Sequence, residues 1–155
     1  MSAAEIRETL NAFVAAFNAN DLDRVMSFFA DDAVYRPGDA TEHRGVAAIR
    51  KEFEPQFLGR FGAMRFDEHE LLVDAPARKA VSRWTCRHDI SGARGKQVSW
   101  VQRLGVRMLL GSHFGWEGLD VFHLDERGKI TGKFTYANYR RPLLQREARL
   151  RPRPG

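Results

Sequence analysis

Asp120 lies in a stretch of alternating residues whose neighbours on the same side are apolar. If residues 116–124 form a strand, Trp116, Gly118, Asp120 and Phe122 share one face of it. Ionisation of a buried carboxyl group is costly, so these surroundings favour a protonated acid that can donate, or a base suited to carbon acids. The alternative is an aspartate that pairs with a neighbouring cation for structural reasons. Asp120 is the first candidate for acid/base chemistry.

His88 and Tyr35 are the other candidates for a catalytic role. His88 shares with Trp84 the apolar face of the strand expected at residues 79–90. Adjacent strands lie about 4.8 Å apart, so His88 can be the proton partner of Asp120. A core histidine with satisfied hydrogen bonds is the alternative. Tyr35 lies near the end of a short strand expected at residues 33–36. Its hydroxyl can orient a carbonyl group if the family resemblance described below places it at the pocket mouth; packing in the core or at the rim is the alternative.

Aromatic side chains on the expected inner faces predict the wall of an apolar pocket. On the last strand, the alternation favours Phe134 and Tyr136 as the inward residues. The residues that we expect to contact a ligand are Phe13, Phe17, Trp84, Trp100, Trp116, Phe122 and Tyr136.

Metal-binding and cofactor-binding patterns do not occur in the sequence. The five histidines have neither the i, i+4 spacing nor the facial-triad spacing of metal ligands. The single cysteine, Cys86, excludes a thiolate cluster and an intrachain disulfide. There is no phosphate-binding loop, no dinucleotide-binding fingerprint and no Ser/His/Asp signature. We therefore expect no metal and no cofactor.

The net charge of +5 originates at the end of the chain. Residues 140–155 contain six arginines and one glutamate, so residues 1–139 are electrically balanced. The basic residues thus gather in a proline-containing tail, which we expect to be flexible over residues 141–155, and no specific nucleic-acid partner is indicated. No apolar run is long enough to span a membrane and no secretory signal is apparent, which indicates a cytoplasmic protein without a membrane partner.

The hydrophobic period changes from helical to strand-like near residue 63. Before it, a capping box at residues 2–5 begins a helix whose apolar stripe ends at Phe17, and two shorter helices follow. Helices first and strands afterwards are typical of one α+β domain, expected over residues 1–140. The strands are expected at residues 64–73, 79–90, 115–124 and 129–139.

Residues 91–114 do not fit this pattern. They begin with a glycine-containing loop and continue with Trp100, Leu104 and Met108 on one helical face, although Gly105 weakens a helix. The segment is too apolar for a plain surface loop. One interpretation extends two long strands into a hairpin. The interpretation that we favour is an inserted lid or flap that guards the pocket.

Several segments resemble the nuclear transport factor 2-like superfamily, in particular its SnoaL-like proteins and steroid Δ5-isomerases. The resemblance covers about residues 5–140 without 91–114 and implies an α+β fold in which a cone-shaped, curved mixed β-sheet wraps around N-terminal helices and encloses a pocket. These motifs consist mostly of capping, packing and turn residues, so they specify a fold more than a reaction. They are residues 13–23 (FVAAFNANDLD), 29–35 (FADDAVY), 45–50 (GVAAIR) and 118–130 (GLDVFHLDERGKI).

The resemblance to steroid isomerases implies an oxyanion hole at positions that match Phe13, which has no donor, and Asp120. The neighbourhood of their catalytic base reads Tyr-Arg-Pro at residues 35–37 and has no carboxylate. On the last strand this comparison places Lys133 and Thr135 inward, against the alternation, and both registers stay open.

Two other groups of the superfamily imply other reactions. The Asp-Arg-Asp set of the limonene epoxide hydrolases falls near Trp84 and Cys86, or Arg83 and Thr85 in the other register, and at Thr135. The SnoaL-like polyketide cyclases, in which one strand-borne aspartate acts as acid and base, match Asp120.

The leading hypothesis is a SnoaL-like pocket protein with acid/base chemistry of the isomerase or cyclase type on a hydrophobic carbonyl compound. Its catalytic residues would be Asp120, His88 and Tyr35. The alternative is a non-catalytic ligand-binding or protein-interaction module of the same fold. A second copy of the chain is the other expected partner, because Val81 and Val121 leave an apolar patch on the outer face of the sheet, typical of a homodimer interface.

Overall fold

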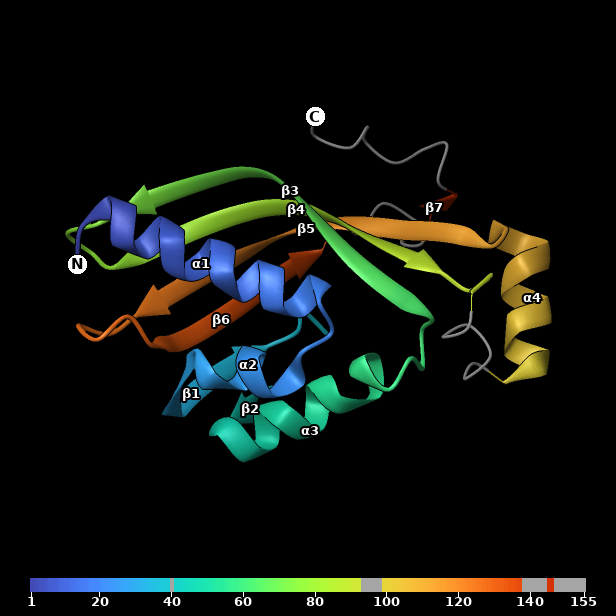
Figure 1. Ribbon diagram of the computed structural model, residues 1–155, viewed down its shortest axis with the longest axis horizontal. Coiled ribbons are helices and arrows are strands. Elements are labelled where there is room, and N and C mark those ends of the chain that lie inside the picture. Colours follow the sequence, from blue (N-terminus) through green and yellow to red (C-terminus); the bar gives the residue numbers. More distant parts are fainter. Residues whose placement is uncertain (40, 93–98, 138–144, 147–155) are drawn as a thin grey trace.

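The computed structural model describes residues 1–39, 41–92, 99–137 and 145–146. Its helices and strands form an α+β fold. Three helices in the N-terminal part of the chain cover one face of a curved sheet, and its first two strands lie between the second and the third helix in sequence (Figure 1). The fold class expected from the sequence is confirmed. The elements are α1 (Ala3–Asn18), α2 (Leu22–Ser27), β1 (Phe29–Arg36), β2 (His43–Arg44), α3 (Val46–Phe57), β3 (Ala63–Asp74), β4 (Lys79–Asp89), α4 (Trp100–Leu110), β5 (His113–Leu124), β6 (Ile130–Ala137) and β7 (Gln145–Arg146).

Helix α1 begins at the predicted capping box. The Ser2 hydroxyl accepts from the Glu5 amide at 3.2 Å, and the Glu5 carboxylate accepts from the Ser2 amide at 2.6 Å, so two otherwise unpaired amides are satisfied. The apolar stripe of α1 then packs against the sheet, and the buried members of that stripe are Ile6, Leu10, Phe13, Ala16 and Phe17.

The sheet has the strand order β2-β1-β6-β5-β4-β3, and β7 pairs with β5. Strand β1 runs parallel to β6, and the other described pairs are antiparallel. The registers place Asp120 of β5 between Ser82 of β4 and Thr135 of β6. They also place Lys133 of β6 opposite Tyr35 of β1. Polar residues from four strands therefore meet on the inner face of the sheet.

A bulge in β3 sets which of its residues face the core. Between Glu68, opposite Trp84, and Glu70, opposite Arg83, the strand contains one extra residue, His69. This extra residue keeps Glu68 on the inner face while Leu71, opposite Ser82, also faces inward and packs against the core.

Phenylalanine rings fill most of the space between the helices and the sheet. Phe13 lies at the centre of this packing and makes edge-on contacts with four other rings at centroid distances of 5.8–6.0 Å. Such edge-to-face geometry is favourable between aromatic rings. The rings around Phe13 are Phe17, Phe28, Phe29 and Phe122.

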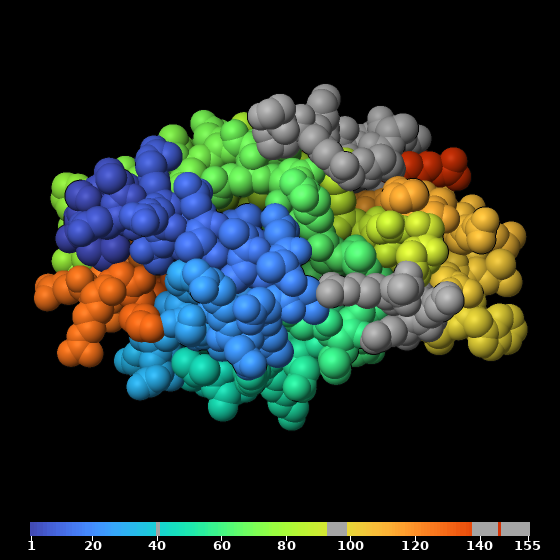
Figure 2. Space-filling view, viewed as in Figure 1, coloured from blue at the N-terminus to red at the C-terminus, as the bar shows by residue number. Residues whose placement is uncertain are grey.

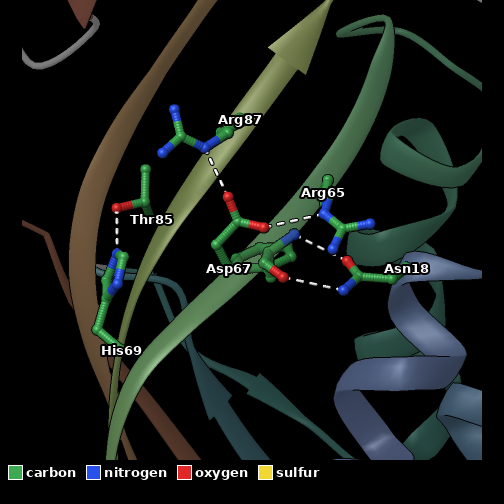
Figure 3. A network of polar contacts seen from close by, with 7 residues as sticks. Asn18, Arg65, Asp67, His69, Thr85 and Arg87 are labelled. Carbon is green, nitrogen blue, oxygen red and sulfur yellow. Dashed lines mark hydrogen bonds and ion pairs between the residues drawn. The ribbon is translucent and has the colours of Figure 1, made fainter. Parts of the chain in front are cut away.

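A polar network fastens the end of α1 to β3 (Figure 3). The Asn18 side chain exchanges two hydrogen bonds with the backbone of Phe66, at 2.9 Å and 2.8 Å. On the other face of β3, Asp67 is buried and accepts from Arg87 at 2.6 Å and from Arg65 at 2.9 Å. Although burial raises the pKa of Asp67, these two guanidinium groups lower it by more, so the carboxylate stays ionised.

Helix α4 lies at one end of the molecule, beyond the ends of β4 and β5 (Figures 1 and 2). Its half-buried residues Val106 and Leu110 pack against Ile90 and Phe114, which form a small cluster separate from the main core. The segment 91–114 thus contains the helix α4 and the first two residues of β5, and its residues 93–98 lie outside the described residues. Apart from Gln145–Arg146, the basic tail expected at residues 141–155 also lies outside them. No helix in the described ranges is long and apolar enough to cross a membrane.

Candidate functional site

A cavity of about 70 Å³ lies between the N-terminal helices and the inner face of the sheet. Its helical side is aromatic, and its sheet side carries a carboxylate and an ammonium group. Several lining residues, among them Val14, Gln56 and Trp116, are only half buried and form its rim. The lining residues are Phe13, Val14, Phe17, Tyr35, Phe53, Gln56, Phe66, Glu68, Ser82, Trp84, Trp116, Asp120, Phe122, Lys133 and Thr135.

Asp120 forms hydrogen bonds with three donors on the sheet side of the cavity. Its Oδ1 accepts from Lys133 Nζ at 2.8 Å and from Thr135 Oγ1 at 2.6 Å. Its Oδ2 accepts from the indole nitrogen of Trp84 at 3.0 Å. A carboxylate offers about four acceptor positions, so one position on Oδ2 remains. Asp120 is therefore part of a buried ion pair, as in the structural alternative considered from the sequence.

Lys133 is an ammonium group held inside the aromatic core. The side chains of Lys133 and Asp120 are 8% and 7% exposed, so water screens the pair little. The nitrogen also donates to Thr135 at 3.0 Å and lies 4.9 Å from the centre of the Tyr35 ring, within the range of a cation–π contact. Two of its three N–H groups are thus in use. The third can donate to a ligand in the cavity.

Tyr35 brings a phenol group to the same end of the cavity. Burial raises the pKa of this phenol above its ordinary value, and the charge of Asp120 raises it further, which outweighs the hydrogen bond with Thr135. The hydroxyl therefore stays protonated and can act as a donor. Tyr35, Thr135 and Asp120 form one connected set of polar groups.

Glu68 contributes a second carboxylate to the cavity. Its Oε2 accepts from the Ser82 hydroxyl at 2.6 Å, and Ser82 lies directly opposite Asp120 in the β4–β5 register. Unlike Asp120, Glu68 has a single hydrogen-bond donor in the described structure. It is half buried, so its remaining acceptor positions can reach both the cavity and solvent.

Gly118 makes room for the indole that hydrogen-bonds to Asp120. A Cβ atom at Gly118 would lie 2.8 Å from the Trp84 ring and 2.9 Å from the Tyr136 carbonyl oxygen. The ring of Trp84 also contacts Trp116 edge-on at 4.9 Å. The position of Trp84, and with it one hydrogen bond of Asp120, depends on glycine at this point of β5.

His88 lies outside this cavity. Its Nδ1 is 3.1 Å from the carbonyl oxygen of Phe61, so this nitrogen carries the proton and donates. The ring stacks on Phe114 at 5.1 Å, and Nε2 is 3.5 Å from the buried sulfur of Cys86. Burial lowers the pKa of His88 to about 4. The structure does not bring His88 to Asp120, because His88 pairs with Phe114 near the other end of the hairpin.

Two of the residues expected to contact a ligand are also elsewhere. Trp100 is 73% exposed on α4, and no described residue of the expected lid lines the cavity. Tyr136 is 57% exposed on the outer face of β6. Of the two registers left open for the last strand, Lys133 and Thr135 face the cavity.

The structure does assemble most of the predicted site. The predicted residues that line the cavity are Asp120, Tyr35, Phe13, Phe17, Trp84, Trp116 and Phe122. Sequence reasoning did not single out Glu68 or Ser82 as site residues. The signal for Glu68 was its alternation with Phe66, and that for Ser82 was its place two residues before Trp84 on the apolar face. Within the described parts of the chain, no group of three or more His, Cys, Asp or Glu side chains is arranged to hold a metal ion.

Solved structures with the same fold include enzymes and ligand-binding proteins. The epoxide hydrolase/cyclase-like enzyme SalBIII, from pyran ring formation in the polyether salinomycin, superposes with a TM-score of 0.70 and 15% identity over 92% of this chain and 95% of its own. A polyketide cyclase proposed for Xanthomonas campestris pv. campestris gives 0.68 and 15%, over 90% and 95%. A Mycobacterium tuberculosis protein in complex with estradiol-17β-hemisuccinate gives 0.67 and 13%, over 91% and 98%. At such identities the likeness shows the fold alone.

Sequence comparison assigns the family. No curated protein sequence matches the chain. The model of the SnoaL-like domain, however, matches residues 10–133, which extend from the second half of α1 to Lys133 and include every cavity-lining residue except Thr135. This match covers most of the chain and agrees with the fold of the solved neighbours. The chain belongs to the SnoaL-like domain family.

Proposed function

We propose that this chain binds a hydrophobic small molecule in the cavity and holds a carbonyl oxygen of that molecule at Lys133. The observation that carries the proposal is the buried Lys133–Asp120 pair, whose ammonium group keeps one N–H free beside an aromatic wall. A mostly apolar pocket with a few convergent polar groups is the usual form of a small-molecule site. Such a ligand is consistent with two of the solved structures of this fold, a proposed polyketide cyclase and a protein in complex with a steroid ester.

The reaction class that these groups support is proton transfer next to the carbonyl group. Glu68 would take a proton from the adjacent carbon, and the electron pair would move to the carbonyl oxygen, where Lys133 and the Tyr35 hydroxyl donate to the developing negative charge. Return of the proton from Glu68 to another carbon would complete an isomerisation. In a cyclisation the carbanion would instead attack a second carbonyl group, and the alkoxide formed there would take up the proton from Glu68. Asp120 is less suited to be the base, because three donors already occupy it.

A second candidate is ligand binding without a reaction. The near-complete hydrogen bonding of Asp120 favours it, since a carboxylate so engaged is a stable anchor for Lys133 rather than a proton shuttle. In this candidate Lys133 recognises the ligand oxygen, and Glu68 only orders Ser82.

A small ketone with acidic C–H groups distinguishes the two candidates. The cavity is smaller than the roughly 300–1,000 Å³ of typical ligand sites, so a ligand must displace the rim, and 2-tetralone is a suitably compact probe. Binding is measured by saturation-transfer NMR, and reaction by deuterium uptake next to the carbonyl in D₂O. The first candidate predicts faster uptake with the wild-type protein and a loss of about 100-fold or more in Glu68→Gln, with binding retained.

Glu70→Gln is the matched control, because Glu70 lies on the same strand but faces outward and pairs with Arg83. It should exchange deuterium like the wild type. Binding without accelerated exchange supports the second candidate. If 2-tetralone and larger apolar ketones all fail to bind, the cavity is not a ligand site.

A further inference from the structure

Helix α4 exposes an apolar surface that neither the core nor the cavity explains. None of its residues is buried. Large apolar side chains are instead more than half exposed, including Trp100 at 73%, Met108 at 74% and Leu109 at 74%. Isolated exposed side chains are ordinary, but a contiguous apolar patch on a folded protein marks an interaction site. We call this patch the α4 surface; it consists of Trp100, Val101, Leu104, Met108 and Leu109.

The α4 surface lies opposite the side by which the helix is attached. At about 100° per residue, its five residues cover roughly half the circumference of the helix. Val106 and Leu110, which pack on Ile90 and Phe114, lie on the other half. The helix is therefore anchored to the hairpin by one side and directs the α4 surface outward. Figure 2 shows the atoms of α4 at one end of the molecule.

The chain segment that carries the α4 surface is basic. From Ile90 to Trp116 the sequence contains three arginines and one lysine, and no aspartate or glutamate. The basic residues are Arg94, Lys96, Arg103 and Arg107.

Arg103 and Arg107 are one turn apart at the edge of the α4 surface, and no acid pairs with either within the described ranges. Arg146 adds a third cation at the end of the helix, where its guanidinium donates to the Leu109 carbonyl at 3.3 Å. Asp89, the acid at the end of β4, is engaged elsewhere: it accepts from Ser91 and lies 3.6 Å from His113.

We propose that the α4 surface docks on an anionic lipid membrane, with its apolar side chains inserted at the level of the headgroups and its arginines against lipid phosphates. A short helix with Trp and Leu on one side and Arg beside them is the form of an interfacial membrane anchor. The charge pattern disfavours a second copy as the occupant, because a two-fold contact through this helix would bring the arginines of both copies together. This proposal is independent of what the cavity binds.

Co-sedimentation with vesicles tests the proposal. The full chain is mixed with vesicles of phosphatidylcholine, with or without about 30% phosphatidylserine, and Trp emission is followed in parallel. We expect binding to the anionic vesicles with a blue shift that Trp100→Phe removes, since Trp100 is the exposed tryptophan. Arg103→Gln/Arg107→Gln should weaken binding about 30-fold, given the attraction of roughly 1 kcal/mol per basic residue at such a surface.

The apolar part is tested by Leu104→Ser/Met108→Ser, which should abolish binding without lowering the melting temperature, because both side chains are exposed. Leu72→Ser is the matched control, because Leu72 is 59% exposed but lies on β3. This variant should bind vesicles like the wild type. Absence of binding to anionic vesicles overturns the proposal. Binding by Leu104→Ser/Met108→Ser that equals that of the wild type also overturns it. A third contrary result is a wild-type dimer in light scattering that this double variant converts to a monomer, when neither protein binds vesicles.

Discussion

Asp120→Asn tests whether the buried ion pair stabilises the fold. The amide that replaces the carboxylate has one acceptor oxygen, whereas Asp120 accepts from Lys133 and Thr135 on one oxygen and from Trp84 on the other. If the amide oxygen faces Lys133, its NH₂ group opposes the indole N–H; if it is flipped, Lys133 faces a donor. Either orientation leaves a buried donor unpaired and removes the negative charge beside a buried ammonium group.

Asp120→Asn should cause a large loss in the free energy of unfolding, although the two side chains have nearly the same shape. Removing one partner of a buried ion pair costs about 3–5 kcal/mol. For a domain of this size, each kcal/mol corresponds to roughly 2–4 °C, so the melting temperature should fall by about 10 °C. Replacing both partners, as in Asp120→Leu/Lys133→Met, removes the stranded charge and should recover most of that loss.

Urea unfolding at pH 7 measures these differences. Glu70→Gln serves as the reference, because Glu70 pairs with Arg83 at 3.1 Å but the two side chains are 49% and 38% exposed. An exposed pair of this kind contributes no more than about 1 kcal/mol. If Asp120→Asn loses no more stability than Glu70→Gln, the pair is not a stabilising contact and the reasoning is refuted.

Three further changes have defined outcomes. Burial lowers the pKa of His88 from 6.5 to about 4, so the unfolded state binds a proton at this histidine at a higher pH than the folded state does. The free energy of unfolding should therefore fall by about 3 kcal/mol as the pH drops from 6.5 to 4. Unfolding curves of His88→Asn should lack this pH-dependent loss. Gly118→Ala should displace Trp84 and lower the melting temperature, and an unchanged tryptophan spectrum would contradict this. If the chain dimerises through the paired outer-face residues Val81 and Val121, Val121→Arg should give monomers in light scattering, whereas a monomeric wild type excludes this interface.

The helices and strands could be predicted because their signals are local. The capping box and the spacing of Ile6, Leu10 and Phe17 specify α1 without reference to the rest of the chain. The same holds for β5 and β6, which the turn at residues 125–128 separates in sequence. Most residues of the cavity wall could be predicted from local signals of the same kind.

Partners across strands could not be read from the sequence. Lysine is rarely buried, and Lys133 lies inward only because Asp120 neutralises it from the neighbouring strand. That contact depends on the register of the β5–β6 hairpin, which places Phe122 rather than His123 opposite Lys133. Because the other face of β6 carries aromatic residues such as Tyr136, the alternation of the sequence favoured the opposite register.

A shared face is also not a shared site. His88 and Trp84 lie on the same side of β4, but His88 is six residues from Ser82, which pairs with Asp120, a distance of about 20 Å along the strand. Helix α4 lies beyond the cavity for the same reason, because it connects the end of β4 to the start of β5, far along these strands from Asp120. Alternation gives the face of a residue but not its position along a long strand.

The parallel pairing of β1 with β6 ties the formation of the cavity to the completion of synthesis. Tyr35 and Lys133 are neighbours in the sheet although about 100 residues separate them in the chain. A nascent chain that has emerged as far as β5 therefore has Asp120 but no counter-ion, and the apolar stripe of α1 lacks part of its cover. Such distant contacts form slowly, which leaves this stripe open to chaperones until β6 arrives. Stable folding on the ribosome should therefore wait until β6 has left the exit tunnel.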